Sequence, residues 1–141
     1  MTATAREIAD VIARANSGAP DADPGAFDRL LADDVTWQVV GRDLAWARTY
    51  HGKAEVYGEY MGPLQQRLDP AATTITNVDT FVDDVAGAIV FHNHDVLAFL
   101  SGESVEVDVI LVMRVTDGLI THIREVMDLR QVAEVIGPAL G

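Results

Sequence analysis

Two acidic residues lie inside long apolar runs of the sequence. Asp95 stands between Phe91-His92-Asn93-His94 and Val96-Leu97, and Glu125 follows thirty positions later in a second run. Carboxylates are among the groups least often buried, because removing an ionised group from water is costly. Two carboxyls on one apolar surface cannot both ionise cheaply, so one keeps its proton near neutral pH. The pair therefore predicts general acid–base chemistry, with one carboxyl as proton donor and the other as base.

The predicted turns fix which residues share a sheet face with these acids. Asp117-Gly118 is a strong two-residue hairpin signal, and such a turn places Glu125 opposite Ile110. A second tight turn at Ser101-Gly102 places Asp95 opposite Asp108. Alternation then gives one face with these members: Phe91, Asn93, Asp95, Asp108, Ile110, Val112, Ile123, Glu125 and Met127. The two acids would lie roughly 10 Å apart, whereas a one-residue slip at Ser101-Gly102 would put them on opposite faces.

The elements that position these residues follow from capping signals and periodicity. Thr4-Ala5-Arg6-Glu7 is a capping box for a first helix, and Asp23-Pro24 begins a short second one. Gly52 opens a third helix that is kinked near Gly62-Pro63, and Asp128 caps a closing helix. The predicted strands cover residues 35–40, 73–82, 86–99, 105–116 and 119–127, and the closing helix covers 129–136. Helices first and an antiparallel meander afterwards predict an α+β fold.

Length and composition limit the classes of protein. At 141 residues, with 49% apolar and 23% charged residues, the chain is expected to form a single domain over residues 1–141. Its net charge of −12 disfavours nucleic acid and membranes as partners. No apolar run reaches transmembrane length and no signal peptide is recognisable, so a soluble, cytoplasmic protein is expected. The chain has no cysteine, which excludes thiolate catalysis and cysteine-bound zinc.

Four segments give the sequence a resemblance to a known family. They are Leu31-Ala32-Asp33-Asp34-Val35-Thr36-Trp37, Tyr50-His51-Gly52-Lys53, Asp117-Gly118-Leu119-Ile120 and Arg124-Glu125-Val126-Met127-Asp128. Over nearly its whole length the chain resembles the SnoaL-like branch of the nuclear-transport-factor-2-like superfamily. The resemblance implies a cone, in which a curved antiparallel sheet wraps around N-terminal helices and encloses an apolar pocket. Relatives include polyketide cyclases, ketosteroid isomerases, limonene-type epoxide hydrolases and proteins with no known activity, and they imply a homodimer through the outer sheet face.

The epoxide-hydrolase branch is the nearest match around the acids. Its central unit is Arg-x-Asp on one strand and Arg-Asp-Tyr-Phe-Asp on the last, and Asp95 and Glu125 occupy the positions of its two catalytic aspartates. The resemblance implies that one carboxyl donates a proton while the other acts as base. Asn93 replaces the arginine that holds the two acids, and could orient a carboxyl or a substrate oxygen or make a structural hydrogen bond. Trp37 and Val39 replace the tyrosine and asparagine that hold water, which favours ring closure or isomerisation over epoxide hydrolysis.

Further residues are predicted to form the pocket wall, although packing alone would explain the aromatic and methionine members and Asp108 could instead lie on the strand surface. They are Trp37, Val39, Tyr57, Tyr60, Met61, Phe91, Asp108, Ile110 and Met127. His92, His94 and His122 could hold a metal, but alternation puts them on the face opposite the acids, so neither metal nor cofactor is expected. Asp95 could instead cap a bent strand or pair with an arginine. Glu125 could instead point to solvent beside Arg114 or Arg124.

Two hypotheses of function follow from these residues. In the first, the protein is a small cofactor-independent enzyme that uses Asp95 and Glu125 for cyclisation, isomerisation or epoxide opening. Its substrate would be an apolar, polyketide-like or terpenoid-like small molecule. In the second, the same pocket binds a small molecule without chemistry, or the chain is a dimeric scaffold.

Overall fold

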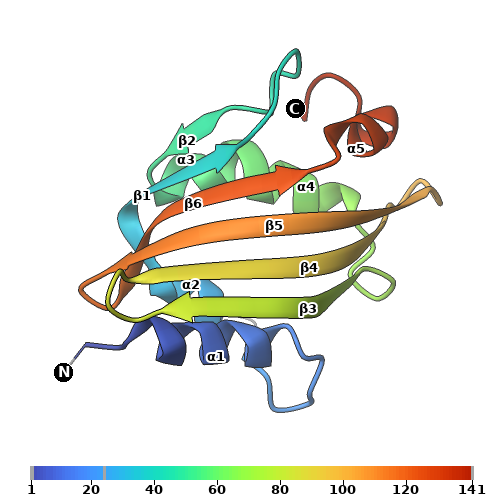
Figure 1. The fold of residues 1–141 in the computed structure, drawn as a ribbon. Coiled ribbons are helices and arrows are strands. Elements are labelled where there is room, and N and C mark those ends of the chain that lie inside the picture. Colours follow the sequence, from blue (N-terminus) through green and yellow to red (C-terminus); the bar gives the residue numbers. More distant parts are fainter. Residues whose placement is uncertain (1, 24, 141) are drawn as a thin grey trace.

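The computed structural model of the protein describes residues 2–23 and 25–140 and has the predicted α+β architecture (Figure 1). A curved six-stranded sheet wraps around helices, and a last helix follows the final strand. The elements in chain order are α1 (Ala5–Ala15), α2 (Ala26–Leu30), β1 (Leu31–Val39), β2 (Thr49–His51), α3 (Lys53–Glu55), η1 (Val56–Met61), α4 (Gly62–Arg67), β3 (Thr74–Asp83), β4 (Ala88–Ala98), β5 (Ser104–Thr116), β6 (Leu119–Met127) and α5 (Leu129–Ile136). No helix in the described part of the chain is long and apolar enough to span a membrane.

The predicted helix caps are confirmed at both ends of the chain. The Thr4 hydroxyl accepts a hydrogen bond from the Glu7 N–H at 3.1 Å, which begins α1. The Asp128 carboxylate accepts from the Arg130 N–H at 3.1 Å and begins α5. The second helix was predicted from Asp23-Pro24. Pro24 lies outside the described residues, and α2 itself begins at Ala26.

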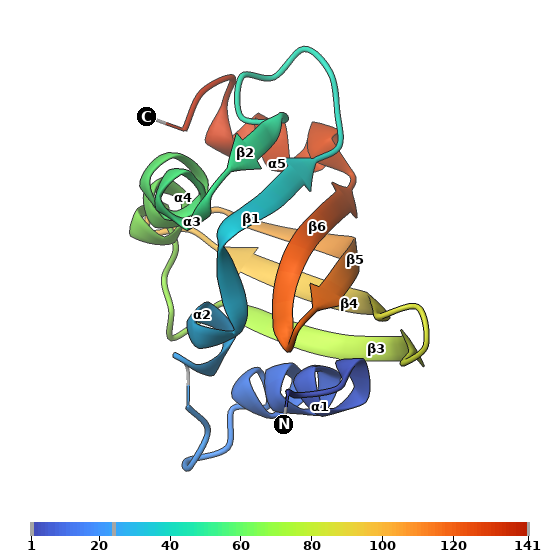
Figure 2. The ribbon, with the colours of Figure 1, turned by 90° about the vertical axis from the view of Figure 1, so that its left-hand side faces the viewer.

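The sheet differs from the prediction in one pairing. Its strand order is β2-β1-β6-β5-β4-β3, and β1 runs parallel to β6, whereas every other pair is antiparallel. The sheet is therefore mixed and not wholly antiparallel. A parallel pair needs a long crossover connection, and here three helical segments and four further strands lie between β1 and β6 in the chain. The cone shape is confirmed, because the sheet curves around the helices (Figure 2).

The pairing of the central strands differs from the predicted register in two places, by one residue each, and the two differences cancel for Asp95 and Glu125. Asp117 and Gly118 both have positive φ and form the predicted two-residue turn. Beyond it Thr121 is an extra residue without a strand partner, so Glu125 pairs with Leu111 and not with Ile110. The β4–β5 loop spans residues 99–103 instead of a tight Ser101-Gly102 turn, so Asp95 pairs with Val107 and not with Asp108.

The two shifts change which residues of the middle strand, β5, face inward. The inward-facing residues of β4 and β6 stay as predicted. Because each is one residue, both turn β5 over relative to the prediction. Asp95 and Glu125 therefore still share the inner face, whereas Asp108, Ile110 and Val112 point to the outer face.

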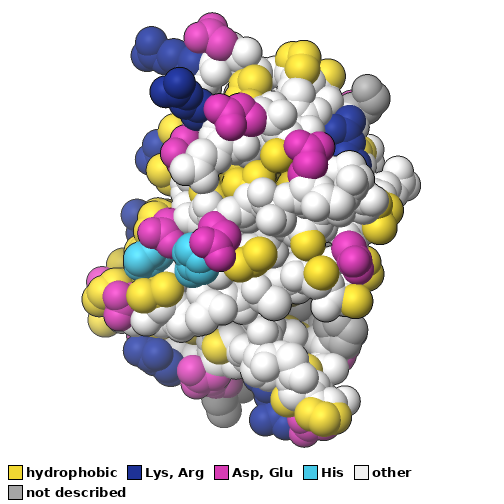
Figure 3. Space-filling model, turned by 90° about the vertical axis from the view of Figure 1, so that its right-hand side faces the viewer, with side chains coloured by type: hydrophobic (Ala, Val, Ile, Leu, Met, Phe, Trp, Pro, Cys, Tyr) yellow, Lys and Arg dark blue, Asp and Glu magenta, His cyan; other side chains and the backbone are white. Residues whose placement is uncertain are grey.

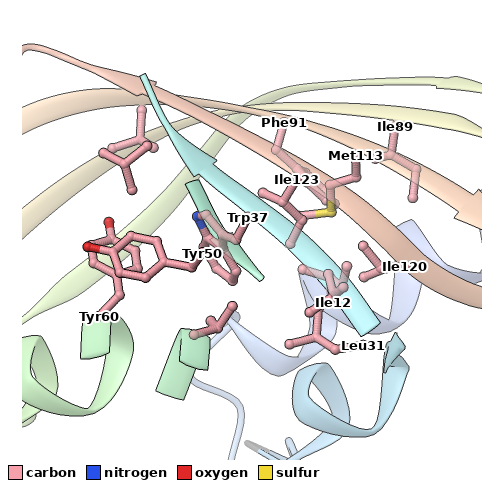
Figure 4. Packing of buried hydrophobic residues seen from close by; sticks show 14 of the residues in the cluster. Ile12, Leu31, Trp37, Tyr50, Tyr60, Ile89, Phe91, Met113, Ile120 and Ile123 are labelled. Carbon is pink, nitrogen blue, oxygen red and sulfur yellow. The ribbon is translucent and has the colours of Figure 1, made fainter. Parts of the chain in front are cut away.

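The core lies between the inner sheet face and the helices. Helices α2 to α4 lie on one side of the sheet and α1 packs against β3, while the other sheet face carries no helix of the described chain (Figure 2). Fully buried side chains include Ile8 of α1, Tyr50 of β2 and Met113 of β5. In Figure 4 the aromatic side chains of Trp37, Tyr50 and Tyr60 lie together at one end of this cluster. The aliphatic side chains of Ile12, Ile89 and Ile120 lie farther along the cluster.

Candidate active site

A π-helical turn brings Tyr60 into the interior. Residues Val56–Met61 form η1, and the Gly62 N–H donates to the Tyr57 carbonyl five residues earlier. A Cβ on Gly62 would lie 2.3 Å from that carbonyl oxygen, so only glycine fits at this position. The predicted kink near Gly62-Pro63 is therefore a π turn that precedes α4. As a result the Tyr60 side chain is 2% exposed and points at the sheet.

Glu125 is held by two donors on one of its oxygens. The Tyr60 hydroxyl donates to Glu125 Oε1 at 2.6 Å, and the Trp37 indole N–H donates to the same oxygen at 3.1 Å. Burial raises the pKa of Glu125, and the hydrogen bonds from Tyr60 and Trp37 act in the opposite direction. Oε2 receives no hydrogen bond from the described residues, which leaves it available to a bound molecule.

An aromatic group surrounds the Tyr60–Glu125 contact. The Tyr60 ring stacks on Tyr50 with centroids 5.1 Å apart and meets Trp37 edge-on at 6.0 Å. Burial, and then the charge of Glu125, raise the pKa of Tyr60 well above its ordinary value. The phenol therefore remains protonated and donates to the carboxylate. The Arg48 guanidinium carbon lies 3.9 Å from the centroid of the Tyr50 ring, in a cation–π contact at the outer side of this aromatic group.

Asp95 is the second carboxyl of the site and lacks partners. Its Oδ1 is the one buried side-chain oxygen or nitrogen in the described chain that has no hydrogen-bond partner. Burial, followed by the charge of Glu125, raises the pKa of Asp95 to about 7. Because Glu125 has two donors and Asp95 has none, the negative charge of the pair is best placed on Glu125. Asp95 is then the carboxyl that keeps its proton near neutral pH.

A small cavity joins the two carboxyls. It measures about 50 Å³ and is bounded by Asp95, Glu125 and Tyr60 together with an apolar wall of Trp46, Leu64, Leu97, Val109, Met127, Val132 and Ile136. This volume holds one or two water molecules, whereas sites for organic ligands occupy several hundred Å³. A substrate therefore needs part of the wall to move.

Part of the cavity wall comes from α5, and side chains of other elements hold the tail that follows α5. The Arg67 guanidinium donates to the carbonyls of Ile136 at 2.8 Å and Leu140 at 3.1 Å. The Trp46 indole donates to the Gly137 carbonyl at 3.1 Å. These bonds hold Val132 and Ile136 over the cavity. Val132, Ile136 and Leu140 of this segment are also buried in the core, so apolar packing holds it together with these bonds.

The structure brings together only some of the predicted site residues. Asp95, Glu125, Tyr60 and Met127 line the cavity, and Trp37 bonds to Glu125. Val39 is buried in the core, and Met61 packs partly buried against it. Asn93 and Phe91 line a separate groove beside α1. Tyr57 also lies away from the cavity, and its pKa rises to about 12 through burial and a hydrogen bond involving Asp28.

Two predicted wall residues lie on the wrong face for that role. Asp108 and Ile110 are on the outer face because the β4–β5 loop and the Thr121 bulge turn β5 over. Asp108 contacts His94 Nδ1 at 2.8 Å and His92 Nε2 at 3.7 Å. This contact raises the pKa of His94 and lowers that of Asp108. Figure 3 shows acidic side chains directly against the exposed histidines.

The remaining wall residues were missed in the sequence. Trp46 comes from the β1–β2 connection and Val132 and Ile136 from α5, and no periodic pattern connects these segments to the acids. Leu64 was detectable, because it follows Tyr60 by four residues on a helical face. As for metals, the described residues contain no group of three or more histidine, cysteine, aspartate or glutamate side chains that could hold an ion.

Comparisons with known proteins agree with this fold. A model of the SnoaL-like domain matches residues 8–123. Similar solved structures include a nuclear-transport-factor-2-like protein of unknown function from Burkholderia pseudomallei, with 16% identity over 92% of this chain and 97% of that one and a TM-score of 0.73. A candidate isomerase from Bacillus subtilis has 13% identity over 97% and 98% and a TM-score of 0.72. A candidate SnoaL-like polyketide cyclase from Jannaschia has 15% identity over 93% and 90% and a TM-score of 0.67. No curated protein sequence matches the chain.

Proposed function

Since this chain belongs to the SnoaL-like domain family, we propose that it is a small enzyme that moves protons with Asp95 and Glu125 during isomerisation or ring closure. The observation that carries the proposal is the shared cavity. One carboxyl there has a buried oxygen without a partner, and the other is held by two donors. Similar structures named as a candidate polyketide cyclase and a candidate isomerase support this class of reaction. The apolar wall favours an apolar, polyketide-like or terpenoid-like substrate.

The environments of the two acids support a starting role for each of them. Glu125 begins as the carboxylate base, because Tyr60 and Trp37 fix its Oε1 and leave Oε2 free to take a proton. Asp95 begins as the acid, because burial and the neighbouring negative charge favour its protonated form. A donor whose pKa lies near the working pH is well suited to both giving and recovering a proton.

The proton transfers balance over two steps. Glu125 first removes a proton from a carbon next to a carbonyl, while Asp95 donates its proton to the carbonyl oxygen, which forms a neutral enol. For isomerisation, Asp95 recovers the enol proton and protonated Glu125 delivers its proton to a different carbon. For ring closure, the enol carbon attacks a second carbonyl carbon, whose oxygen takes the proton from Glu125 while Asp95 recovers the enol proton. Both carboxyls return to their starting states.

The size of the cavity favours a second candidate function. At about 50 Å³ the closed site is too small for an organic substrate, as expected of a binding protein or a scaffold whose interior is merely packed. In that case the two acids would be a residual feature of the fold. The two candidates differ in what happens to a ketone that enters the site.

Turnover in deuterated water distinguishes them. The probes are a β,γ-unsaturated ketone, a linear triketone and an apolar epoxide, with deuterium incorporation and product formation as readouts. We expect Asp95→Asn and Glu125→Gln each to reduce turnover by about 10²-fold to 10⁴-fold. Asp108→Asn is the matched control, because it alters a carboxyl on the opposite sheet face. Unchanged turnover in both acid variants would refute the assignment, and no turnover of any probe by the wild type would favour the binding protein.

A further inference from the structure

A second and larger hollow lies between α1 and the strands β3 and β4. It measures about 340 Å³, within the range of small-molecule sites, whereas the acid cavity is several times smaller. Its apolar walls come from Ile12 of α1, Ile75 of β3 and Phe91 of β4. Ile75 is 41% exposed, so an apolar surface remains uncovered there. We call this hollow the α1–β3 groove.

The groove is electrically neutral, which is unusual on this protein. The chain carries a net charge of −12, yet the residues that line the groove include no aspartate, glutamate, lysine, arginine or histidine. Its polar groups are amides and hydroxyls, such as those of Asn16 and Asn93. An ionic ligand would find no counter-charge there, and its desolvation would go uncompensated. The groove therefore favours a neutral ligand.

Asn93 supplies one directed donor to the groove. It is 6% exposed, and its Oδ1 accepts a hydrogen bond from Asn77 Nδ2 at 3.1 Å. Asn77 Nδ2 also donates to the Asp79 carbonyl at 3.1 Å, and the Thr80 hydroxyl donates to Asn77 Oδ1 at 3.0 Å. Because a carbonyl can only accept, these bonds fix the orientation of both amides. Asn93 therefore turns its oxygen to Asn77 and keeps its nitrogen for another partner.

That nitrogen has access to the groove. No described residue accepts a hydrogen bond from Asn93 Nδ2. The one unpartnered side-chain atom that is fully enclosed in the described chain is Asp95 Oδ1, so Asn93 Nδ2 keeps contact with open space. The open space that Asn93 lines is the α1–β3 groove. A nearly buried donor without a partner is costly unless a bound acceptor or water satisfies it.

We propose that the α1–β3 groove is a ligand site for a neutral, mostly apolar molecule that carries one carbonyl or ether oxygen. That oxygen accepts the hydrogen bond from Asn93 Nδ2, and the body of the molecule packs on Ile12, Ile75 and Phe91. The site is independent of proton transfer at Asp95 and Glu125. It also gives Asn93 a role in binding and not in orienting the acids.

The test uses 1-indanone as probe, with indane as its matched hydrocarbon, on protein labelled with nitrogen-15. Both are titrated at equal concentrations below the solubility of indane, and the side-chain amide signals of Asn93 and Asn77 are followed by NMR. We expect 1-indanone to shift the Asn93 amide and to bind about two-fold to ten-fold more tightly than indane, as one hydrogen bond provides. Glu125→Gln should leave this binding unchanged, which separates the groove from the acid cavity.

A variant that fills the groove makes the test local. Ala13 is exposed on α1 and lines the groove, so Ala13→Phe should occupy it without disturbing the core. We expect at least ten-fold weaker binding of 1-indanone to this variant. Val11→Phe is the matched control, because Val11 is 40% exposed on the same helix and does not line the groove. Equal affinity for 1-indanone and indane, no shift of Asn93, or unchanged binding to Ala13→Phe would each overturn the proposal.

Discussion

Replacing Asp95 with asparagine should stabilise the protein most at alkaline pH. The pKa of Asp95 is about 7 in the fold against 3.8 for the free group. Between these values the folded state binds more protons than the unfolded state, so the free energy of unfolding falls as pH rises. The penalty is absent well below pH 4, grows up to about pH 7 and then stays constant. Asparagine is neutral at every pH, so the Asp95→Asn variant does not carry this loss of stability.

The size of the effect follows from the difference between the two pKa values. Each pH unit between them is worth about 1.4 kcal/mol, so the full penalty is about 4 kcal/mol. More than half of it develops between pH 5 and pH 8. Because Asp95 is partly exposed, solvent screening reduces the expected change over that interval to about 2 kcal/mol.

Urea unfolding at pH 5 and pH 8 measures this change. The stability of Asp95→Asn relative to the wild type should increase by about 2 kcal/mol between the two pH values. Asp10→Asn is the control, since Asp10 is an exposed carboxyl on α1 that does not line the cavity. If the wild type and Asp95→Asn had parallel stability curves over this interval, Asp95 would not be a proton-holding carboxyl.

Three further variants test how the site is built. Gly62→Ala should cost about 1 to 3 kcal/mol in thermal unfolding, because its Cβ would lie 2.3 Å from the Tyr57 carbonyl oxygen. Tyr60→Phe removes the 2.6 Å hydrogen bond to Glu125 and should raise the pKa of Glu125 further, as seen by carbon-13 NMR of its carboxyl. Arg67→Ala removes the donor that holds the tail carbonyls, so amide hydrogen exchange in α5 should become faster.

Each of these variants has a matched control in the chain. Gly58→Ala lies in the same π-helical turn with nothing within 4 Å of its added Cβ, and should be tolerated. Tyr57→Phe alters a phenol outside the cavity and should not affect Glu125. Arg130→Ala removes an arginine of α5 itself and should leave the exchange rates unchanged. A control that behaved like its test variant would show that the effect does not arise from the named contact.

The sequence predicted that Asp95 and Glu125 share a sheet face, but it did not predict the strand registers that place them there. The Asp117-Gly118 turn follows from local chemistry, because few residues adopt positive φ readily. The Thr121 bulge and the five-residue loop at 99–103 have no comparable local signal. Each reverses the faces of the strands that follow, and the two together restore the relation of Asp95 to Glu125. Asp95 and Glu125 keep the predicted face because the two register differences cancel for them, whereas Asp108, Ile110 and Val112 of β5 do not.

The contacts that hold Glu125 and enclose the two acids come from segments that are distant in the sequence. The π turn that aims Tyr60 at Glu125 is read in the sequence only as a kink at Gly62-Pro63. The parallel pairing of β1 with β6 brings Trp37 to Glu125, and the order of elements alone suggested an antiparallel meander. The position of α5 over the cavity depends on hydrogen bonds from Arg67 to the Ile136 carbonyl and from Trp46 to the Gly137 carbonyl. Such long-range contacts have no periodicity that a single sequence could reveal.

The most direct measurement of the central claim is a carbon-13 NMR titration of the Asp95 carboxyl in the wild type and in Glu125→Gln. In the wild type Asp95 should titrate at a pKa of about 7. In Glu125→Gln the negative charge is gone, so the pKa of Asp95 should be lower but still above its ordinary value, since burial is the larger cause. A wild-type Asp95 that titrates near 3.8, or the same pKa in both proteins, would contradict a coupled acid–base pair.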